Sequence, residues 1–250
     1  MADPRVELAV LNNVFWYLGI FRAHSIGCTV NADTWSSPLQ ALPFHSNLVV
    51  LSPTLERARL QTCLDDLQQT KTFRGWSMKD SYGQFDLTAA GFRVLFNARW
   101  IWREPAETQP APPDGDGDID WFRVRNHAQL LEWEAAWHGD SRNLTADHPA
   151  PQFPASLLDS ADHAFLAGRR RGGAVVAGCV LNRSPGVVGV SNLFARQMDP
   201  NEAWASLVRL AGRLFPGRPL VGYERGDDLV HARHAGFVPL GPLAVWATEA

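Results

Sequence analysis

The stretch VVGVSNLFARQMDPNEAWASLVRLAGRLF, residues 187–215, predicts a buried strand that leads through a short loop into an amphipathic helix. Its first nine residues form a mostly aliphatic run, which is typical of a central strand. Asp199 stands at the position of an N-cap, Pro200 at the first helical position, and Glu202 completes a capping-box arrangement. Apolar side chains then recur at helical spacing. They are Trp204, Leu207, Val208, Ala211, Leu214 and Phe215.

Strands and helices alternate on both sides of this unit. On the C-terminal side we expect a strand, a short helix and a final strand, at 220–224, 227–235 and 237–247. On the N-terminal side we expect a strand, a helix and a hairpin, at 121–124, 127–138, 164–168 and 174–181. The Arg-Arg-Arg-Gly-Gly run at 169–173 supplies the hairpin turn.

Residues 105–118, PAETQPAPPDGDGD, contain no apolar side chain larger than alanine. Such a composition buries too little surface to offset the entropy of ordering, so it predicts an exposed linker. The linker divides the chain into residues 1–104 and 119–250, which we expect to be two domains.

Two tripeptides repeat across this linker with the same offset. Ser-Asn-Leu at 46–48 recurs 145 positions later at 191–193, and Ala-Gly-Phe at 90–92 recurs at 235–237. Internal duplication is the simplest explanation, and coincidence in a leucine- and alanine-rich chain is the alternative. In the first copy we expect helices at 7–24 and 53–69 and strands at 48–51, 76–79 and 92–102. Little more than one short strand fits between the first helix and Ser46, so this copy is predicted to be truncated.

The order strand, helix, hairpin, strand, helix, strand, helix, strand resembles that of the GCN5-related N-acetyltransferase (GNAT) superfamily. Three local features carry the resemblance: the glycine turn and aliphatic run at 173–178, the strand joined to a helix at 187–215, and the junction at 232–237, which ends in Gly-Phe. The resemblance covers about 119–250 and more weakly 6–104. It implies an α/β (α+β) fold in tandem, with a mixed central sheet flanked by helices in each half and a degenerate N-terminal half.

The resemblance also implies acetyl-CoA or another acyl-CoA as co-substrate. In the family, a glycine-rich loop offers backbone N–H groups to the pyrophosphate where the helix begins. Here Asp199 and Asn201 replace the glycines, Pro200 has no N–H, and the Asp199 carboxylate is expected to occupy the free N–H groups. These departures argue against tight coenzyme A binding. The residues that the resemblance implies for the cofactor are Leu193, Phe194, Ala195, Arg196 and Asn201.

The catalytic positions of the family are also changed. A tyrosine that protonates the leaving thiolate in many members corresponds to Ala232 or Leu87 here. The glutamate of the central strand is replaced by Ser-Asn at 191–192. Tyr223 and Glu224, at the end of the following strand, can replace them as acid and base. The alternative is a strand-edge tyrosine beside a surface carboxylate.

Other polar residues have both a functional and a structural interpretation. Asn47 and Asn192 hold the same place in the two copies, and we expect them on paired central strands. They either line a cleft between the halves or satisfy a bulge or a neighbouring backbone group. Lys79-Asp80 is interpreted as a salt-bridged turn. His231 and His234 share a helical face, but no further ligand stands at convincing spacing, so we expect no metal.

Composition excludes several function classes. A net charge of −3 over 250 residues argues against general attraction to nucleic acid or to an anionic membrane. The three cysteines are widely spaced, which fits reduced thiols better than a disulfide framework. No apolar run reaches the ~20 residues that a membrane helix needs, and the N-terminus lacks the features of a signal peptide. We therefore expect a cytoplasmic protein.

Two functions are consistent with these observations. The first is a GNAT-type N-acyltransferase that moves an acyl group from acyl-CoA, or from a carrier-bound thioester, to a small-molecule amine. Its catalytic candidates are Tyr223, Glu224 and Asn192. The second is a non-catalytic GNAT-fold protein that binds a metabolite, a protein partner or a second copy of itself.

The gap between the strands at 187–195 and 220–224 distinguishes the two functions. An open gap with free N–H groups at its mouth favours the enzyme. A gap filled by Trp204, Phe194 or Met198 favours the binding protein.

Overall fold

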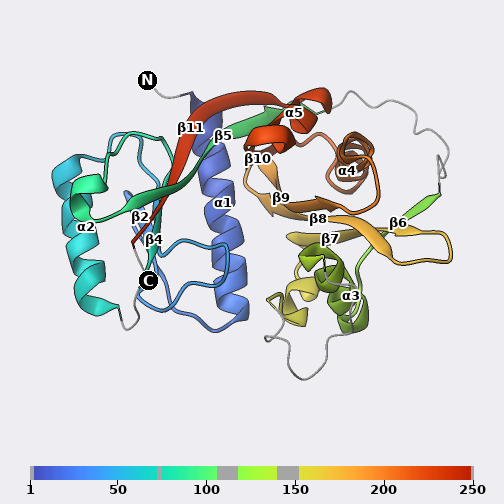
Figure 1. Ribbon diagram of the computed structural model, residues 1–250, viewed down its shortest axis with the longest axis horizontal. Coiled ribbons are helices and arrows are strands. Elements are labelled where there is room, and N and C mark those ends of the chain that lie inside the picture. Colours follow the sequence, from blue (N-terminus) through green and yellow to red (C-terminus); the bar gives the residue numbers. More distant parts are fainter. Residues whose placement is uncertain (1–2, 72–74, 106–117, 140–151, 249–250) are drawn as a thin grey trace.

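The computed structural model describes residues 3–71, 75–105, 118–139 and 152–248, and they form one mixed eleven-stranded sheet with helices on both faces (Figure 1). This confirms the predicted fold class. Of the predicted linker, residues 106–117 lie outside the described residues. Below, the first half means residues 3–105 and the second half residues 118–248. No helix within the described ranges combines the length and apolar character needed to cross a bilayer.

The first half contains two helices and five strands. They are α1 (Pro4–Ala23), β1 (Thr29–Val30), β2 (Thr34–Ser36), β3 (Leu48–Val50), α2 (Arg57–Thr70), β4 (Ser77–Asp80) and β5 (Arg93–Arg103), with a 3-10 turn at Thr88–Ala90. Two short antiparallel strands, rather than one, precede Ser46. Helix α2 begins four residues later than predicted, because the Ser52 hydroxyl accepts from the Thr54 N–H and holds 52–55 in a turn.

The second half contains the elements that the sequence predicts. They are β6 (Ile119–Arg123), α3 (His127–His138), β7 (His163–Arg170), β8 (Val175–Ser184), β9 (Val187–Ala195), α4 (Pro200–Leu214), β10 (Leu220–Glu224), α5 (Gly226–His234) and β11 (Val238–Ala247), with a 3-10 turn at Ala155–Asp159. The predicted N-cap is confirmed, since Asp199 Oδ1 accepts from the Asn201 N–H at 2.9 Å.

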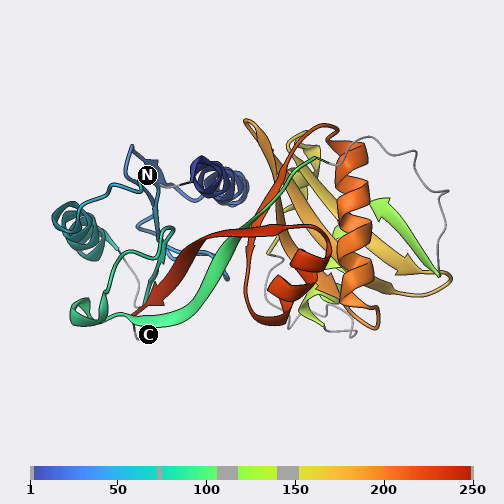
Figure 2. The same cartoon turned by 90° about the horizontal axis from the view of Figure 1, so that it is seen from above.

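The strand order joins the two halves into one sheet. It runs β1-β2-β3-β4-β11-β5-β10-β9-β8-β7-β6. The last strand, β11, lies between β4 and β5 of the first half and is antiparallel to both. Strand β5 in turn pairs with β10 of the second half. The long strands β5 and β11 run side by side from one half into the other (Figures 1 and 2).

The prediction that Asn47 and Asn192 lie on paired strands is wrong. Asn47 immediately precedes β3, which pairs with β2 and β4, whereas β9, which holds Asn192, pairs with β8 and β10. Strands β4, β11, β5 and β10 separate the two positions. The reason is that the halves are joined by the pairing of β11 with β4 and β5 and of β5 with β10. The two Ser-Asn-Leu segments do not pair with each other.

Helices α1 and α3 cover one face of the second-half strands, and α4 and α5 cover the other. Aromatic residues of α1 and α3 pack on one face with Phe165, Val180 and Phe194. On the opposite face, Trp204 and Leu207 of α4 and Ala232 of α5 pack with residues of β8, β9 and β10: Leu181, Val188 and Leu220. Successive residues of β9 and β10 therefore face different helix pairs.

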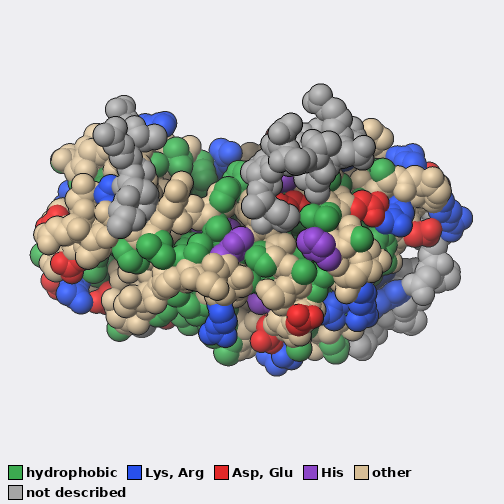
Figure 3. Space-filling view, turned by 90° about the horizontal axis from the view of Figure 1, so that it is seen from below, with side chains coloured by type: hydrophobic (Ala, Val, Ile, Leu, Met, Phe, Trp, Pro, Cys, Tyr) green, Lys and Arg blue, Asp and Glu red, His purple; other side chains and the backbone are tan. Residues whose placement is uncertain are grey.

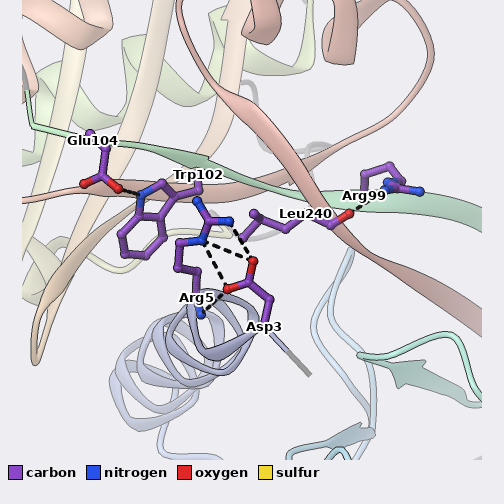
Figure 4. Close-up of polar contacts among 6 residues, drawn as sticks. All are labelled: Asp3, Arg5, Arg99, Trp102, Glu104 and Leu240. Carbon is purple, nitrogen blue, oxygen red and sulfur yellow. Dashed lines mark hydrogen bonds and ion pairs between the residues drawn. The ribbon is translucent and has the colours of Figure 1, made fainter. Parts of the chain in front are cut away.

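Helix α1 lies between α2 and the strands of the second half (Figure 2). At its start, Asp3 accepts from the Arg5 N–H at 2.9 Å and pairs with the Arg5 guanidinium at 2.7 Å. This end lies beside β5 and β11, where Trp102 Nε1 donates to Glu104 at 2.8 Å and Arg99 donates to the Leu240 carbonyl (Figure 4). From there α1 packs along β8, β9 and β10. It thereby places polar residues of its middle turns beside the ends of β9 and β10.

Candidate active site

Strands β9 and β10 separate after a short parallel pairing. Their register contains only Leu220 opposite Val188 and Val221 opposite Gly189. On its other edge β9 has a bulge, because Gly178 pairs with Phe194 and Val180 with Ser191, which leaves two residues opposite Cys179. One of the two is Asn192, whose φ of 52° is left-handed. The bulge and the short pairing produce an open gap between the strands.

A cavity of about 380 Å³ lies at this gap. Its walls come from α1, from the loop before β3, from β5 and β8, from the ends of β9 and β10, and from the start of α5. Tyr223 packs with residues of α1, and the next residue, Glu224, lies near Asp228 of α5. Because consecutive strand residues face opposite sides of a sheet, the cavity reaches both faces through the gap. None of Trp204, Phe194 and Met198 lines it, so these side chains do not fill the gap.

The α1 side of the cavity has an aromatic wall. Tyr17 and His45 have ring centroids 4.7 Å apart, and Trp100 and Tyr223 meet edge to face at 5.5 Å. Burial lowers the pKa of His45 to about 4, so this imidazole is neutral at physiological pH. Phe44, with a φ of 64°, is 73% exposed at the rim. In the view from below, histidine side chains lie near the middle of the molecule among hydrophobic ones (Figure 3).

Among the titratable groups of the cavity, Glu224 has the environment most typical of a catalytic residue. Burial, together with the negative charge of Asp228, raises the pKa of Glu224 to about 8, and Arg225 opposes this shift. A carboxyl group with such a pKa exchanges its proton near neutral pH, as a general base for an amine must. The structure therefore gives Glu224 an environment that an ordinary surface carboxylate does not have.

Lys79 lies directly behind the cavity wall, where it is 1% exposed. Its Nζ donates to Asn13 Oδ1 at 2.8 Å and lies 3.5 Å from the Tyr223 hydroxyl. It also lies 5.0 Å from the ring centroid of Tyr17 and 4.4 Å from that of Tyr223. Burial lowers the pKa of Lys79, but the phenol oxygens of Tyr17 and Tyr223 outweigh this and raise it above its usual value. The side chain is therefore a buried ammonium.

The interpretation of Lys79-Asp80 as a salt-bridged turn is wrong. The Asp80 carboxylate accepts from the N–H groups of Tyr82 at 3.2 Å and Phe85 at 2.8 Å, so it organises the turn after β4. No carboxylate in the described ranges forms an ion pair with Lys79. The sequence-based interpretation missed the role of Lys79, although one signal was available: the chain contains only two lysines, and one of them stands within a predicted strand.

Of the two repeated asparagines, only Asn192 reaches the cavity. Its Nδ2 donates to the Ser191 hydroxyl at 3.3 Å, and both residues line the cavity. Asn47 is buried, and its Nδ2 donates to the carbonyls of Leu39 at 2.9 Å and Ser37 at 3.3 Å. Asn47 is thus a structural residue of the loop before β3.

The residues predicted to hold the cofactor do not converge on one place. Leu193 lines the cavity. Phe194 is buried on the α3 face, 5.3 Å from the ring of Trp133, and Ala195 ends β9 opposite Ala177. Their assignment to a cofactor stays a prediction.

The two polar members of that set already have partners. Arg196 donates to the carbonyl of Trp137 at 2.8 Å and so caps the C-terminal end of α3. Asn201 Oδ1 lies 2.9 Å from His231 Nδ1 and 3.3 Å from His234 Nδ1, which ties α4 to α5. Within the described ranges, no three His, Cys, Asp or Glu side chains are arranged to hold a metal ion.

Comparisons with known proteins identify the fold. No protein-family model and no curated protein sequence matches the chain. A functionally unknown conserved protein from Staphylococcus epidermidis superposes with a TM-score of 0.63 at 11% identity, over 92% of this chain and 97% of that one. A GCN5-related N-acetyltransferase from Kribbella flavida gives 0.62 at 16% identity, over 97% and 96%. Saccharomyces cerevisiae N-myristoyltransferase gives 0.52 at 7% identity, over 81% and 60%. The chain has the fold of the GCN5-related N-acetyltransferases.

Proposed function

We propose that this protein is an N-acyltransferase that moves an acyl group from acyl-CoA, or from a carrier-bound thioester, to a small-molecule amine. Because this fold alone does not determine an activity, the proposal rests on the site. The observation that carries it is the position of Glu224, with a pKa of about 8, in a cavity where β9 and β10 separate. A general base of this strength beside an open strand gap suits deprotonation of an amine next to a bound thioester.

The reaction needs one proton acceptor and one proton donor. The amine nitrogen attacks the thioester carbonyl carbon, its proton passes to the Glu224 carboxylate, and the new C–N bond replaces the C–S bond. The leaving thiolate takes a proton from the Tyr223 phenol. Solvent then returns a proton to the phenol and takes the proton from the Glu224 carboxyl group. Lys79 lowers the pKa of Tyr223, but burial and the nearby Tyr17 raise it above its usual value, so the phenol is protonated before the reaction. Asn192 and the unpaired edge of β9 would line the thioester arm.

A second candidate is a non-catalytic protein that binds a metabolite or a partner. The N-terminal end of α4 favours it, because Asp199 already accepts from the Asn201 N–H and Asn201 contacts two histidines. A bound pyrophosphate at this end would have to lie beside the Asp199 carboxylate, and like charges repel. If the protein is non-catalytic, we expect a ligand to bind in the cavity without turnover.

The two candidates can be separated by measuring binding and turnover on the same samples. Thermal unfolding would be followed with acetyl-CoA, longer acyl-CoAs and free CoA, since a ligand at 100 times its Kd adds about 2.7 kcal/mol. Mass spectrometry would then detect N-acylated products from a panel of small amines, with Glu224→Gln as the matched variant. Product formation that the variant loses supports the enzyme. Binding without product supports the second candidate, and no shift at millimolar concentrations directs the test to carrier-bound thioesters.

A further inference from the structure

The α1 side of the cavity contains three neutral polar groups that surround the Lys79 ammonium. Asn13 and Tyr17 come from α1, and Tyr223 comes from β10. All three line the cavity, whereas Lys79 lies behind them, fully buried. The positive charge reaches the cavity wall, since it also helps to lower the pKa of His45.

The Lys79 ammonium determines which atoms of these three groups point toward it. Lysine Nζ has only donors, so the atom of Asn13 that it contacts at 2.8 Å must be the carbonyl oxygen. The Asn13 NH2 group is then left with its two donors. The Tyr223 oxygen likewise accepts from Lys79, and the Tyr17 oxygen accepts from the Ser46 N–H at 3.1 Å. Each phenol retains its own O–H to donate.

This arrangement gives one wall of the cavity several hydrogen-bond donors and a buried positive charge. A buried charge without a counter-ion is costly in a protein interior, and an incoming anion would offset part of that cost. Hydrogen bonds from such donors to a carboxylate are stronger than those to a neutral acceptor. The other titratable groups that line the cavity are the neutral His45 and, on the α5 side, the acidic Glu224 and Asp228.

We propose that Asn13 and Tyr17, backed by Lys79, bind the carboxylate of the acceptor, so that the acceptor is an amine that also carries a carboxylate, such as an amino acid. The carboxylate lies on the α1 side, and the amine lies toward Glu224 and Asp228. The two ends of the cavity thus have opposite charge preferences that match a zwitterion. The cavity volume of about 380 Å³ accommodates a molecule of amino-acid size. The role of this ligand as the acceptor rests on the proposed function, whereas the carboxylate site itself does not.

The lysine content of the chain permits a direct test. Lys71 and Lys79 are its only lysines, so protein labelled with ¹³C at lysine Cε gives two signals in an NMR spectrum. The probes are acetate and matched pairs that differ by the carboxylate: phenylalanine and phenethylamine, tyrosine and tyramine. We expect the carboxylate member of at least one pair to shift the Lys79 signal saturably, with at least a tenfold lower Kd than its amine, while the Lys71 signal stays in place.

Variants test whether the preference comes from this wall. Lys79→Met should fold, because an apolar side chain of similar length replaces a buried charge, and it should abolish the tenfold preference for the carboxylate member. Tyr17→Phe keeps the ring and removes one O–H, so a several-fold loss of carboxylate affinity is expected. Arg57→Met is the control, because it removes a positive charge from exposed helix α2 of the same half and should change neither Kd. If Lys79→Met does not fold, Tyr17→Phe carries the test.

Three results would overturn the proposal: equal binding of both members of each pair, no carboxylate that moves the Lys79 signal at millimolar concentration, or a preference that persists in Lys79→Met. None of these measurements needs an acyl donor, so a failure of the proposed transferase activity leaves them interpretable. Conversely, turnover of amines that lack a carboxylate, with the acids unused, would uphold the transferase and reject the carboxylate site.

Discussion

The amide oxygen of Asn201 lies 2.9 Å from Nδ1 of His231. Since the oxygen can only accept, His231 carries its proton on Nδ1. The contact joins the first turn of α4 to α5, and in this turn the Asn201 N–H also donates to the Asp199 carboxylate. A helix N-terminus ordinarily attracts phosphate. Here a fixed anion and an interhelical contact occupy it.

The effect of that anion on coenzyme A binding can be measured with Asp199→Asn. Asparagine caps a helix about as well as aspartate, so the fold should be retained while the negative charge is lost. We expect CoA to bind roughly 2- to 5-fold more tightly at low ionic strength, which corresponds to about 0.4 to 1 kcal/mol. Calorimetric titration with CoA checks this. Unchanged affinity of Asp199→Asn for CoA would mean that the phosphates bind elsewhere. Glu202→Gln, which removes a negative charge from the same turn, serves as the control for charge alone.

Glu224→Gln should reduce the rate of acyl transfer by roughly 10²- to 10⁴-fold, because it removes the proton acceptor and keeps the shape of the side chain. The wild-type kcat/KM should rise with pH to a plateau above about 8, the pKa of this carboxyl group. This rising limb of the pH profile should be absent from the residual kcat/KM of Glu224→Gln. Asp228→Asn should move the limb to lower pH, because the Asp228 charge helps to raise that pKa. A variant with an unchanged profile would show that Glu224 is not the base.

The same carboxyl group should make the fold less stable at high pH. Its pKa is about 8 in the folded protein and about 4.3 when unfolded, so between these values the folded state alone holds the proton. The free energy of unfolding therefore falls as pH rises from about 4.3 to about 8. With allowance for partial exposure, Glu224→Gln should be about 1 to 2 kcal/mol more stable than wild type at pH 9. Urea denaturation at pH 5 and pH 9 measures this, and an equal difference at both pH values would contradict it.

The backbone at Asn192 should tolerate glycine and reject a β-branched residue. Its φ of 52° costs nothing for glycine and about 1 to 2 kcal/mol for valine. The free energy of unfolding of Asn192→Gly should thus lie within about 0.5 kcal/mol of the wild-type value, whereas that of Asn192→Val should be lower by about 1 to 2 kcal/mol. Denaturant unfolding of the two variants distinguishes them. Equal stabilities would show that the bulge in β9 relaxes.

A fragment of residues 1–104 should not fold alone. It lacks β11, which pairs with both β4 and β5, so two strands would expose unpaired edges and lose the packing of Trp246 in the first-half core. Circular dichroism of the fragment should show little native strand structure, and co-expression with residues 118–250 should restore it. A fragment that folds independently would support the division into two domains that the linker predicts.

The sequence predicted local structure well because its signals are local. The helix at His127–His138 and the strands at Val187–Ala195 and Leu220–Glu224 have the predicted bounds, since capping residues, turns and apolar runs mark their ends. Sheet order is not a local property. The strand that pairs with β5 is β11, which lies more than 100 residues away in the sequence. A hydrophobic pattern within one strand does not indicate such a distant partner.

The candidate site was predictable only in part for the same reason. Tyr223 and Glu224 were found because they end a strand next to the central one, and Asn192 because it recurs in a repeat. Lys79 was interpreted as part of a salt-bridged turn and Asn13 was not found, because a lysine in a short strand and an asparagine within a helix look like surface residues. Their importance comes from the 2.8 Å contact between them, which joins positions 66 residues apart.

The insertion of β11 between β4 and β5 also has a consequence for biosynthesis. When the ribosome has completed Arg103, the strand that fills the space between these two has not been translated, and about 135 further residues precede it. At about 5 to 20 residues per second, this is a delay of roughly 7 to 27 seconds. During that time the nascent first half has two open strand edges, where β4 and β5 lack their partner. Pairing of the ten residues of β11 is then the closing step of vectorial folding.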